Sequence, residues 1–391
     1  MPRRPHVSPT TRTLSEEVFG KLASPARAPG GPAHPLHVGD TWREPPEPGR
    51  AENQHGAEHP HLHNYAPVQG EPALLDAIVH ALRHRTGSAP DRERVQVVPG
   101  ATAGLSIVCN ALLDPGDELL LPAPFWPLIR GIVAARGAHP VQVPFFDRVG
   151  APDFDPERAL EQAVTERTAA LYLNTPHNPT GRVLPPEVVD AMLRVARRHD
   201  LWVLCDEAYE ALWFGDGPPD PAWAHPEARG RAVACHTLSK SHGLAGARIG
   251  WIHGPEPAMR AIRDLQTFQT YCAARPMQVG AARALREGDG WVLEARRLYA
   301  QAGRAAAEAL GVEPPQGGTF LFFDASPHLH PADVDCLPFL ARCLEAGVRL
   351  TPGASCGEAY GRWARLCFTA VPPDALSDAL ARLRQVLGPP A

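Results

Sequence analysis

A short run between Thr237 and Gly250 combines groups that can hold an aldehyde and a phosphate together. It reads Thr-Leu-Ser-Lys-Ser-His-Gly-Leu-Ala-Gly-Ala-Arg-Ile-Gly and follows an apolar stretch, 232–235, that is typical of a buried strand. Lys240 stands among small residues, so a flat ligand can reach its amine. The Thr237 hydroxyl and the Arg248 guanidinium can both bind a phosphate. A partly desolvated amine beside an independent phosphate anchor suits a Schiff base with pyridoxal phosphate.

This run closely resembles the cofactor-attachment signature of the class I/II aminotransferases, the fold-type I enzymes that depend on pyridoxal phosphate. The resemblance implies that Lys240 is the catalytic residue that forms the Schiff base, and that Thr237 and Arg248 bind the cofactor phosphate. Thr237 departs from the family, which usually has Ser or Gly there, but threonine keeps the hydroxyl. A lysine in an ordinary surface loop is the alternative, and further motifs in the family's order argue against it.

Two of these motifs directly follow expected strands. The segment 99–105 opens a helix, and free amides at a helix N-terminus bind anions. Three of its residues match the family's phosphate-binding positions: Gly100, Ala101 and Thr102. The segment 122–126 ends in Trp126, a flat side chain that can stack on a pyridine ring and that matches the family's stacking position. A core tryptophan is the alternative for Trp126.

Another motif, 174–181, contains Asn-Pro-Thr-Gly. Its Asn178 can donate a hydrogen bond to the phenolic oxygen of the cofactor. The resemblance implies a cis peptide bond before Pro179, which would aim Asn178 inward. An ordinary turn is the alternative.

The segment 204–209 reads Leu-Cys-Asp-Glu-Ala-Tyr and ends an apolar strand with a carboxylate. Burying the carboxylate of Asp206 is costly unless it is paired, and a pyridinium nitrogen is a suitable partner. Tyr209, three residues later, lies toward the same side and can donate to the phenolic oxygen. A helix N-cap is the alternative role for Asp206.

The resemblance also implies contacts to the substrate. Gly39 permits close backbone approach and would help to hold the substrate carboxylate. Arg365 matches the arginine that binds the α-carboxylate through its planar fork. Trp126 and Asn178 would also border the substrate. A strand-to-loop turn at Gly39 and a surface role for Arg365 are the alternatives.

Tyr65 begins the segment Tyr-Ala-Pro-Val-Gln-Gly, and the family has a tyrosine here that reaches the cofactor phosphate of a partner subunit. The resemblance therefore implies a homodimer with shared active sites. An interface or core tyrosine is the alternative. A second departure, Cys356 where many relatives have Phe, is expected to change the lining of the entrance.

Apolar strand-like runs alternate with helical patterns through the middle of the chain. The expected strands are 95–98, 118–121, 141–144, 169–173, 202–205, 232–237 and 249–253. Helical periodicity covers, among others, 104–112 and 186–198. This alternation predicts an α/β fold with a mainly parallel seven-stranded sheet between helices, and sites in such sheets collect at the carboxyl ends of the strands.

The C-terminal part predicts a smaller α/β domain. Its expected elements are helices 291–310, 334–346 and 373–387 and strands 319–324 and 365–369. We therefore expect an N-terminal arm and small-domain segment at 1–45, a large pyridoxal-phosphate-binding domain at 46–290 and a small domain at 291–391. A long helical region is expected from 254 to 290.

Composition excludes several classes of protein. The chain has 391 residues, of which 44% are hydrophobic and 21% charged, as in a folded protein. Its net charge of −5 argues against a basic surface of the kind that binds nucleic acid. Its apolar runs are too short to span a membrane. The eight cysteines are scattered, which indicates reduced thiols and a cytoplasmic location. Histidines at 55, 59, 61 and 63 lie in an expected loop, and no metal site is predicted there.

Together these features predict a pyridoxal-phosphate-dependent aminotransferase that moves an amino group from an L-amino acid to a 2-oxo acid. A C–S β-lyase or an oxidase would use the same residues and stays an alternative. A non-catalytic regulator with this fold is less favoured, because the N-terminal arm is too short for a DNA-binding domain. The sequence does not name the amino donor.

Overall fold

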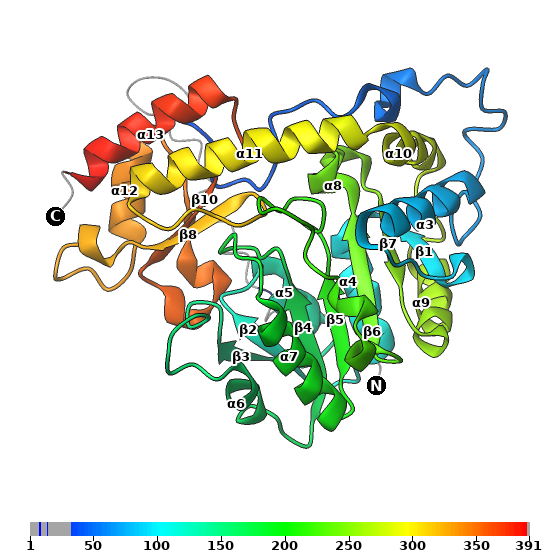
Figure 1. Cartoon of the computed structure of the whole chain (residues 1–391), viewed down its shortest axis with the longest axis horizontal. Helices are drawn as coiled ribbons and strands as arrows, with labels where there is room; N and C mark the ends of the chain where they lie inside the picture. Colours follow the sequence, from blue (N-terminus) through cyan, green and yellow to red (C-terminus); the bar gives the residue numbers. More distant parts are fainter. Residues whose placement is uncertain (1–7, 9–13, 15–32, 389–391) are drawn as a thin grey trace, which may run out of the picture.

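A computed structural model describes residues 8, 14 and 33–388 of the chain (Figure 1). Most of the N-terminal arm expected within residues 1–45 therefore lies outside the described residues. The remainder forms two sheets with helices around them. The larger sheet occupies the centre of the view and the smaller sheet lies above it.

The larger sheet confirms the expected mainly parallel arrangement of seven strands within the described part of the chain. In pairing order its strands are β1 (Val95–Val98), β7 (Gly250–His253), β6 (Ala232–Thr237), β5 (Trp202–Asp206), β4 (Thr168–Asn174), β2 (Glu118–Ala123) and β3 (His139–Pro144). Strand β7 runs antiparallel to both of its neighbours, and the other pairs are parallel. The carboxyl ends of β2, β4, β5 and β6 therefore meet at one edge of the sheet.

Helices cover both faces of this sheet, which is why its strands are apolar almost throughout. One face packs on α4 (Gly100–Leu112), α5 (Pro127–Ala135) and α9 (Glu256–Gln269). The other face packs on α6 (Pro156–Glu161), α7 (Pro186–Arg198), α3 (Pro72–Thr86) and α10 (Arg275–Glu287). Alternate residues of β4 divide between the two layers: Ala170 and Tyr172 face α4, whereas Leu171 and Leu173 face α7.

The smaller sheet is antiparallel and has its own layer of helices. Its strands pair in the order β8 (Phe320–Asp324), β10 (Trp363–Cys367) and β9 (Thr351–Pro352). Its helices are α11 (Asp289–Leu310), α12 (Leu337–Glu345) and α13 (Pro373–Leu387). Helix α11 runs along the top of Figure 1 and connects this layer with α10. The expected small C-terminal α/β unit is confirmed.

Most element bounds agree with the sequence prediction, and the exceptions have local causes. Strand β2 continues two residues further than expected, through Pro122 and Ala123, because β3 pairs with it over that length. Helix α4 begins at Gly100 rather than Gly104, since Gly100 adopts a positive φ of 82° that turns the chain directly into the helix. The long helical region after 254 is divided between α9 and α10, where Tyr271 has a φ of 62°.

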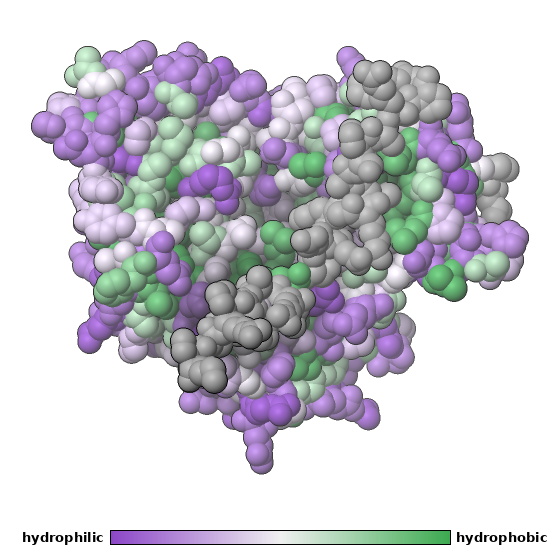
Figure 2. Space-filling view, turned by 180° about the vertical axis from the view of Figure 1, so that it is seen from behind, coloured by the Kyte–Doolittle hydropathy of each residue, from purple (hydrophilic) through white to green (hydrophobic). Residues whose placement is uncertain are grey.

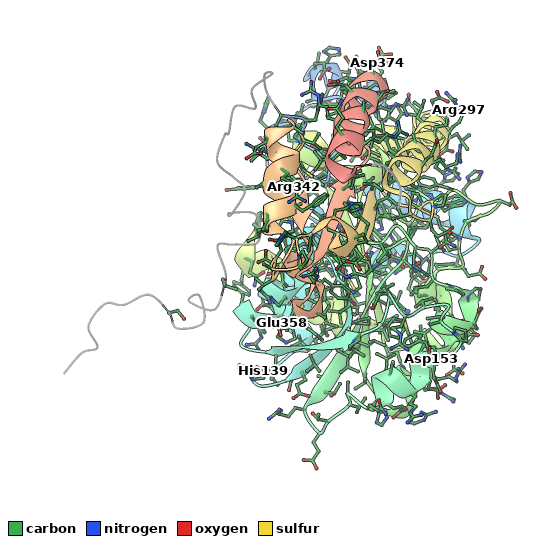
Figure 3. All side chains as sticks on the ribbon, turned by 90° about the vertical axis from the view of Figure 1, so that its left-hand side faces the viewer. His139, Asp153, Arg297, Arg342, Glu358 and Asp374 are labelled. Atoms are coloured by element: carbon green, nitrogen blue, oxygen red, sulfur yellow. The ribbon has the colours of Figure 1, made fainter. Side chains whose placement is uncertain are left out.

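Hydrophilic side chains cover much of the face in Figure 2, which shows the molecule from behind. In Figure 3, Arg297, Arg342 and Asp374 mark the end formed by α11, α12 and α13, and His139 and Asp153 mark the opposite end. None of the helices formed by the described residues has both the length and the apolar character that a bilayer crossing requires.

Gly250 allows β7 to pass closely over the start of α4. A Cβ at this position would press on the carbonyl oxygen of His236 and would lie 3.1 Å from the amide nitrogen of Ala101. Both neighbours are backbone atoms, which cannot rotate away. The glycine therefore sets the distance between the sheet and the helix N-terminus that faces the site.

We predict that Gly250→Ala destabilises the protein by about 1–3 kcal/mol, because overpacking must displace β7 or α4. Gly290 in α11 is the matched control, since a Cβ there meets no atom within 4 Å. Gly290→Ala should leave stability unchanged or raise it by up to about 1 kcal/mol through helix propensity. Thermal unfolding followed by circular dichroism measures both variants. Equal unfolding temperatures for the two would contradict the close-packing argument.

Candidate functional site

One cavity of about 500 Å³ opens at the carboxyl ends of the parallel strands, between the two sheets. Every residue predicted for the site lines it, except Gly100 and Tyr65. The predicted residues in its wall are Gly39, Ala101, Thr102, Trp126, Asn178, Asp206, Tyr209, Thr237, Lys240, Arg248 and Arg365. The sequence motifs therefore converge on a single place in the fold.

Lys240 lies in α8 (Leu238–Ser241), a single turn directly after β6. The hydroxyl of Thr237 begins this turn by accepting the amide hydrogen of Ser239 at 3.2 Å. The Lys240 amine donates a hydrogen bond to the Gly39 carbonyl across the cavity. Burial lowers the pKa of this amine below its usual value, and nearby Asp40 opposes the shift.

The wall beside Lys240 is an anion-binding surface. Arg248 follows the short helix 245–247 with a φ of 54°, and its Nη1 donates to the Ala245 carbonyl at 2.9 Å. The same Nη1 lies 3.5 Å from the Ser239 hydroxyl. The first amides of α4, at Ala101 and Thr102, have no helical acceptor and face the same cavity. Guanidinium, hydroxyls and a helix N-terminus together suit a phosphate.

Gly100 begins α4 beside Arg248. It does not line the cavity but lies behind the Arg248 guanidinium, where a Cβ would come within 2.5 Å of Nη2. The missing side chain therefore gives Arg248 room beside the start of α4. A direct contact between Gly100 and a ligand remains a prediction.

Asp206 ends β5 and is buried at another wall of the cavity. Its Oδ2 accepts a hydrogen bond from the Tyr172 hydroxyl at 2.5 Å, and its Oδ1 accepts from the Ala208 amide at 3.1 Å. Burial raises the pKa of this carboxyl, and both hydrogen bonds oppose that shift. The residues after Asp206 form a turn and not a helix, so the helix N-cap alternative does not apply.

Asn178 connects the residues around Asp206 with Tyr209 through hydrogen bonds. Its Nδ2 donates to the Tyr209 hydroxyl at 3.4 Å, and its backbone amide donates to the side chain of Asn174 at 2.9 Å. Asn174 in turn donates to the Asp206 carbonyl at 2.8 Å. The peptide bond between Asn178 and Pro179 is cis, as expected.

Arg365 reaches the cavity from β10 of the smaller sheet. Its Nη1 donates to the side-chain oxygen of Asn178 at 3.1 Å, and its Nη2 donates to the His37 carbonyl at 3.3 Å. The guanidinium carbon lies 4.2 Å from the centre of the Phe320 ring. Its Nε is buried and has no hydrogen-bond partner among the described residues. Arg365 is therefore a buried cation, and the surface alternative is excluded.

Tyr65 lies outside the cavity of its own chain. Its side chain is 81% exposed and packs edge-on against Tyr271, with ring centres 5.0 Å apart. Together with Thr270 and Arg275 it lines a second, open hollow. The position leaves a contact with another copy of the chain as a prediction.

Several features of the site were not found from the sequence. Besides the predicted residues, the wall includes His37, Ser239, Phe320 and Arg349, and Tyr172 lies directly behind Asp206. Cys356 corrects an expectation: its side chain is fully buried in the core between the two sheets and is not part of the cavity wall. Among the described residues, no group of three or more His, Cys, Asp or Glu side chains could hold a metal ion.

The sequence matches the family model described as "Aminotransferase class I and II" over residues 36–383. The chain belongs to this family. It is 33% identical to the arginine–pyruvate transaminase of Pseudomonas aeruginosa over 305 residues, covering 76% of this chain and 75% of that protein. It is 32% identical to a probable aspartate/prephenate aminotransferase of Thermus aquaticus over 331 residues, covering 83% of each.

Solved structures agree with this assignment. A single mutant of the Thermus thermophilus aspartate aminotransferase superposes with a TM-score of 0.86 at 28% identity, covering 98% of this chain and 100% of that one. The N-succinyldiaminopimelate aminotransferase of Mycobacterium tuberculosis gives 0.83 at 29% identity, covering 90% and 93%. The protein is therefore an aminotransferase with the fold-type I architecture, which acts on amino acids and 2-oxo acids.

We predict that the Lys240 amine reacts with aldehydes at lower pH than an ordinary lysine, because a lowered pKa leaves more of it neutral. Lys240 and Lys21 are the two lysines of the sequence, so their peptides can be quantified separately. Reductive methylation with formaldehyde at a series of pH values, read by mass spectrometry, gives the midpoint for Lys240. The urea-unfolded chain is the control. Coincident midpoints in the folded and unfolded chains would contradict the prediction.

Proposed function

We propose that this aminotransferase holds pyridoxal 5'-phosphate in the cavity and uses it to move an amino group from an L-amino acid to a 2-oxo acid. One observation carries the proposal: a half-buried amine, Lys240, shares one cavity with the guanidinium of Arg248 and the buried carboxylate of Asp206. Pyridoxal phosphate carries the complementary groups, which are an aldehyde, a phosphate and a basic ring nitrogen.

The donor set around the cavity fits each group of the cofactor. Arg248 and Thr237, with Ser239 and the first amides of α4, would hold the phosphate. Asp206 would pair with the ring nitrogen, whose positive charge offsets the cost of burying the carboxylate. Trp126 would cover the ring face. Two polar side chains would bind the phenolic oxygen: Asn178 and Tyr209.

The same residues divide the work of the reaction. When bound, pyridoxal phosphate supplies an aldehyde carbon that takes up the amino group and a ring that withdraws electrons from the substrate α-carbon. Arg365, near the backbone of Gly39, would bind the α-carboxylate and orient the substrate. Lys240 would take the proton from the α-carbon and return it, as base and then acid. Burial favours the first step because it increases the neutral fraction of the amine.

We also propose a homodimer in which Tyr65 contributes to the partner's site. Support comes from the exposed pair Tyr65 and Tyr271, which pack on each other, since exposed aromatic patches favour protein–protein contacts. Tyr65 also lines the open hollow, and Phe268 is a further exposed aromatic residue.

We also propose the domain division and the cytoplasmic location that the sequence predicts. Residues 34–42 bond to the smaller sheet and its helices, for example through the Cys367 amide and the Leu36 carbonyl at 2.7 Å. This supports grouping the segment 1–45 with the small domain 291–391, apart from the large domain 46–290. All eight cysteines are free thiols, which supports a cytoplasmic location.

A half-reaction tests the proposed chemistry. We predict that single L-amino acids convert the cofactor-loaded protein to the aminated cofactor and release one equivalent of the 2-oxo acid. Lys240→Ala should lose this reaction, whereas Lys21→Ala, which changes the other lysine, should keep it. Absorbance spectra and keto-acid assays provide the measurement. The responding donor would identify the substrate class.

Other outcomes of this experiment would contradict specific parts of the proposal. Catalytic release of ammonia and pyruvate would indicate β-elimination, and consumption of oxygen would indicate an oxidase. Either result would leave the cofactor assignment intact. Absence of a cofactor absorbance band would reject the cofactor itself.

The role of Arg365 gives a second prediction. Arg365→Lys should lower kcat/KM by about 10- to 100-fold, mainly through KM, because a point charge replaces a planar fork worth roughly 1.5–3 kcal/mol. Arg297→Lys, on the exposed surface of α11, is the control and should have no effect (Figure 3). Steady-state kinetics with varied donor and acceptor measure both variants. Unchanged KM in Arg365→Lys would contradict carboxylate binding.

A further inference from the structure

Tyr172 carries a buried hydroxyl in the middle of an otherwise apolar strand. Its register in β4 places it opposite Leu204, two residues before the pairing of Asn174 with Asp206. Side chains two residues apart point to the same face of a strand, so Tyr172, Asn174 and Asp206 all face the α4 layer. The Tyr172 hydroxyl donates to Asp206 Oδ2 at 2.5 Å.

The two oxygens of Asp206 have different partners. Oδ1 accepts a hydrogen bond from the backbone amide of Ala208 within the same turn. Any residue except proline at position 208 could supply this amide. Oδ2 is bound by a side chain from a neighbouring strand. Because Tyr172 is buried within a packed layer, its hydroxyl has a fixed position. It therefore determines how the carboxylate is rotated within the cavity wall.

The charged and titratable groups around this pair come from three strands and the turn after β5. Tyr172 belongs to β4, Cys235 to β6, and Tyr209 to the turn. His236 of β6 lies on the opposite face of the sheet and lowers the pKa of Asp206 through its charge. Glu207 is also buried, and burial raises its pKa well above the usual value. Within this set, Tyr172 is the side chain that hydrogen-bonds to the Asp206 carboxylate.

We propose that Tyr172 is a positioning residue that fixes the Asp206 carboxylate through its hydroxyl and keeps it ionised toward the cavity. The part of this inference that concerns the ring nitrogen rests on the proposed function. An ionised carboxylate can form an ion pair with a protonated ring nitrogen. A protonated carboxyl is neutral and cannot form one. The electron-withdrawing capacity of the ring therefore depends on a residue that does not line the cavity.

The electrostatics of the pair support this role. Burial raises the pKa of Asp206, and the Tyr172 hydrogen bond counteracts that shift. Burial also raises the pKa of Tyr172 well above 10, so its hydroxyl stays a donor throughout the working range. Without the hydroxyl, the burial effect on Asp206 is opposed less, and its pKa rises further.

The first test uses the cofactor-free protein. A carboxyl whose pKa is higher in the folded than in the unfolded chain loses stability as pH rises from its unfolded pKa, about 3.9, through its folded pKa. Tyr172→Phe raises the folded pKa of Asp206, so its loss of unfolding temperature relative to the wild-type protein should grow by about 1–2 °C between pH 5 and pH 8. Tyr299→Phe is the matched control, because the Tyr299 hydroxyl pairs with the neutral Thr41 hydroxyl. Its deficit should not depend on pH.

The second test measures affinity for pyridoxal phosphate by spectroscopic titration at pH 8. Tyr172→Phe should raise Kd about tenfold, which is about 1.4 kcal/mol. The same change in an Asp206→Asn background should alter Kd less than about twofold, because the carboxylate on which it acts is gone. If Tyr172→Phe alone fails to fold, the double variant Tyr172→Phe/Asp206→Asn is still compared with Asp206→Asn. The double variant is expected to fold because it has no ionised carboxylate that lacks its hydrogen-bond donor.

The two tests distinguish failure of the positioning role of Tyr172 from failure of the proposed function. A pH-independent deficit in Tyr172→Phe, together with an equal loss of affinity in both backgrounds, would overturn the positioning role and leave Tyr172 as a packing residue. Failure of the wild-type protein to bind pyridoxal phosphate would overturn the proposed function. In that case the cofactor-free measurement would still decide whether Tyr172 controls Asp206.

Discussion

The site depends on the burial of opposite charges that do not pair with each other. Lys240 and Asp206 line the same cavity, and among the described residues neither forms an ion pair. Removing a charge from water costs several kcal/mol unless a partner replaces the solvent. The hydrogen bonds from Tyr172 and Ala208 to Asp206, and from Lys240 to Gly39, replace only part of that solvation. A ligand with complementary charges supplies the remainder, so the cavity is built around the cofactor and substrate that we propose for it.

The fold and most of the cavity wall could be predicted because the chemistry is local in the sequence. Each motif directly follows an apolar run, and parallel strands bring their carboxyl ends to one edge. Thr237, Lys240 and Arg248 lie within twelve residues, and their types alone indicate a phosphate and a reactive amine. Most strands of the larger sheet are buried on both faces and therefore read as short continuous apolar runs, with the edge strand β3 as the exception.

Features that depend on pairing across the sheet were not predictable in this way. Tyr172 stands in an apolar strand, where its sequence signal is that of a core residue, and only the register of β4 against β5 brings it to Asp206. Gly100 is predicted from the sequence to contact the cofactor, but the sequence does not indicate its other neighbour, a guanidinium 148 positions later in the chain. Cys356 was expected at the entrance because the family resemblance implies a large side chain there, yet the fold buries it. In each case the contact partner is distant in sequence, and residue type alone does not identify it.

Arg365 shows how the second sheet completes the site. Its fork is held by Asn178 from the larger sheet and by the His37 carbonyl, with the Phe320 ring 4.2 Å away. Its Nε hydrogen is buried and has no acceptor among the described residues. Because Asn178 also contacts the Tyr209 hydroxyl, Arg365, Asn178 and Tyr209 share one hydrogen-bonded network. Asn178 therefore connects the arginine that we propose to bind the substrate with the side chains that we propose to face the cofactor ring.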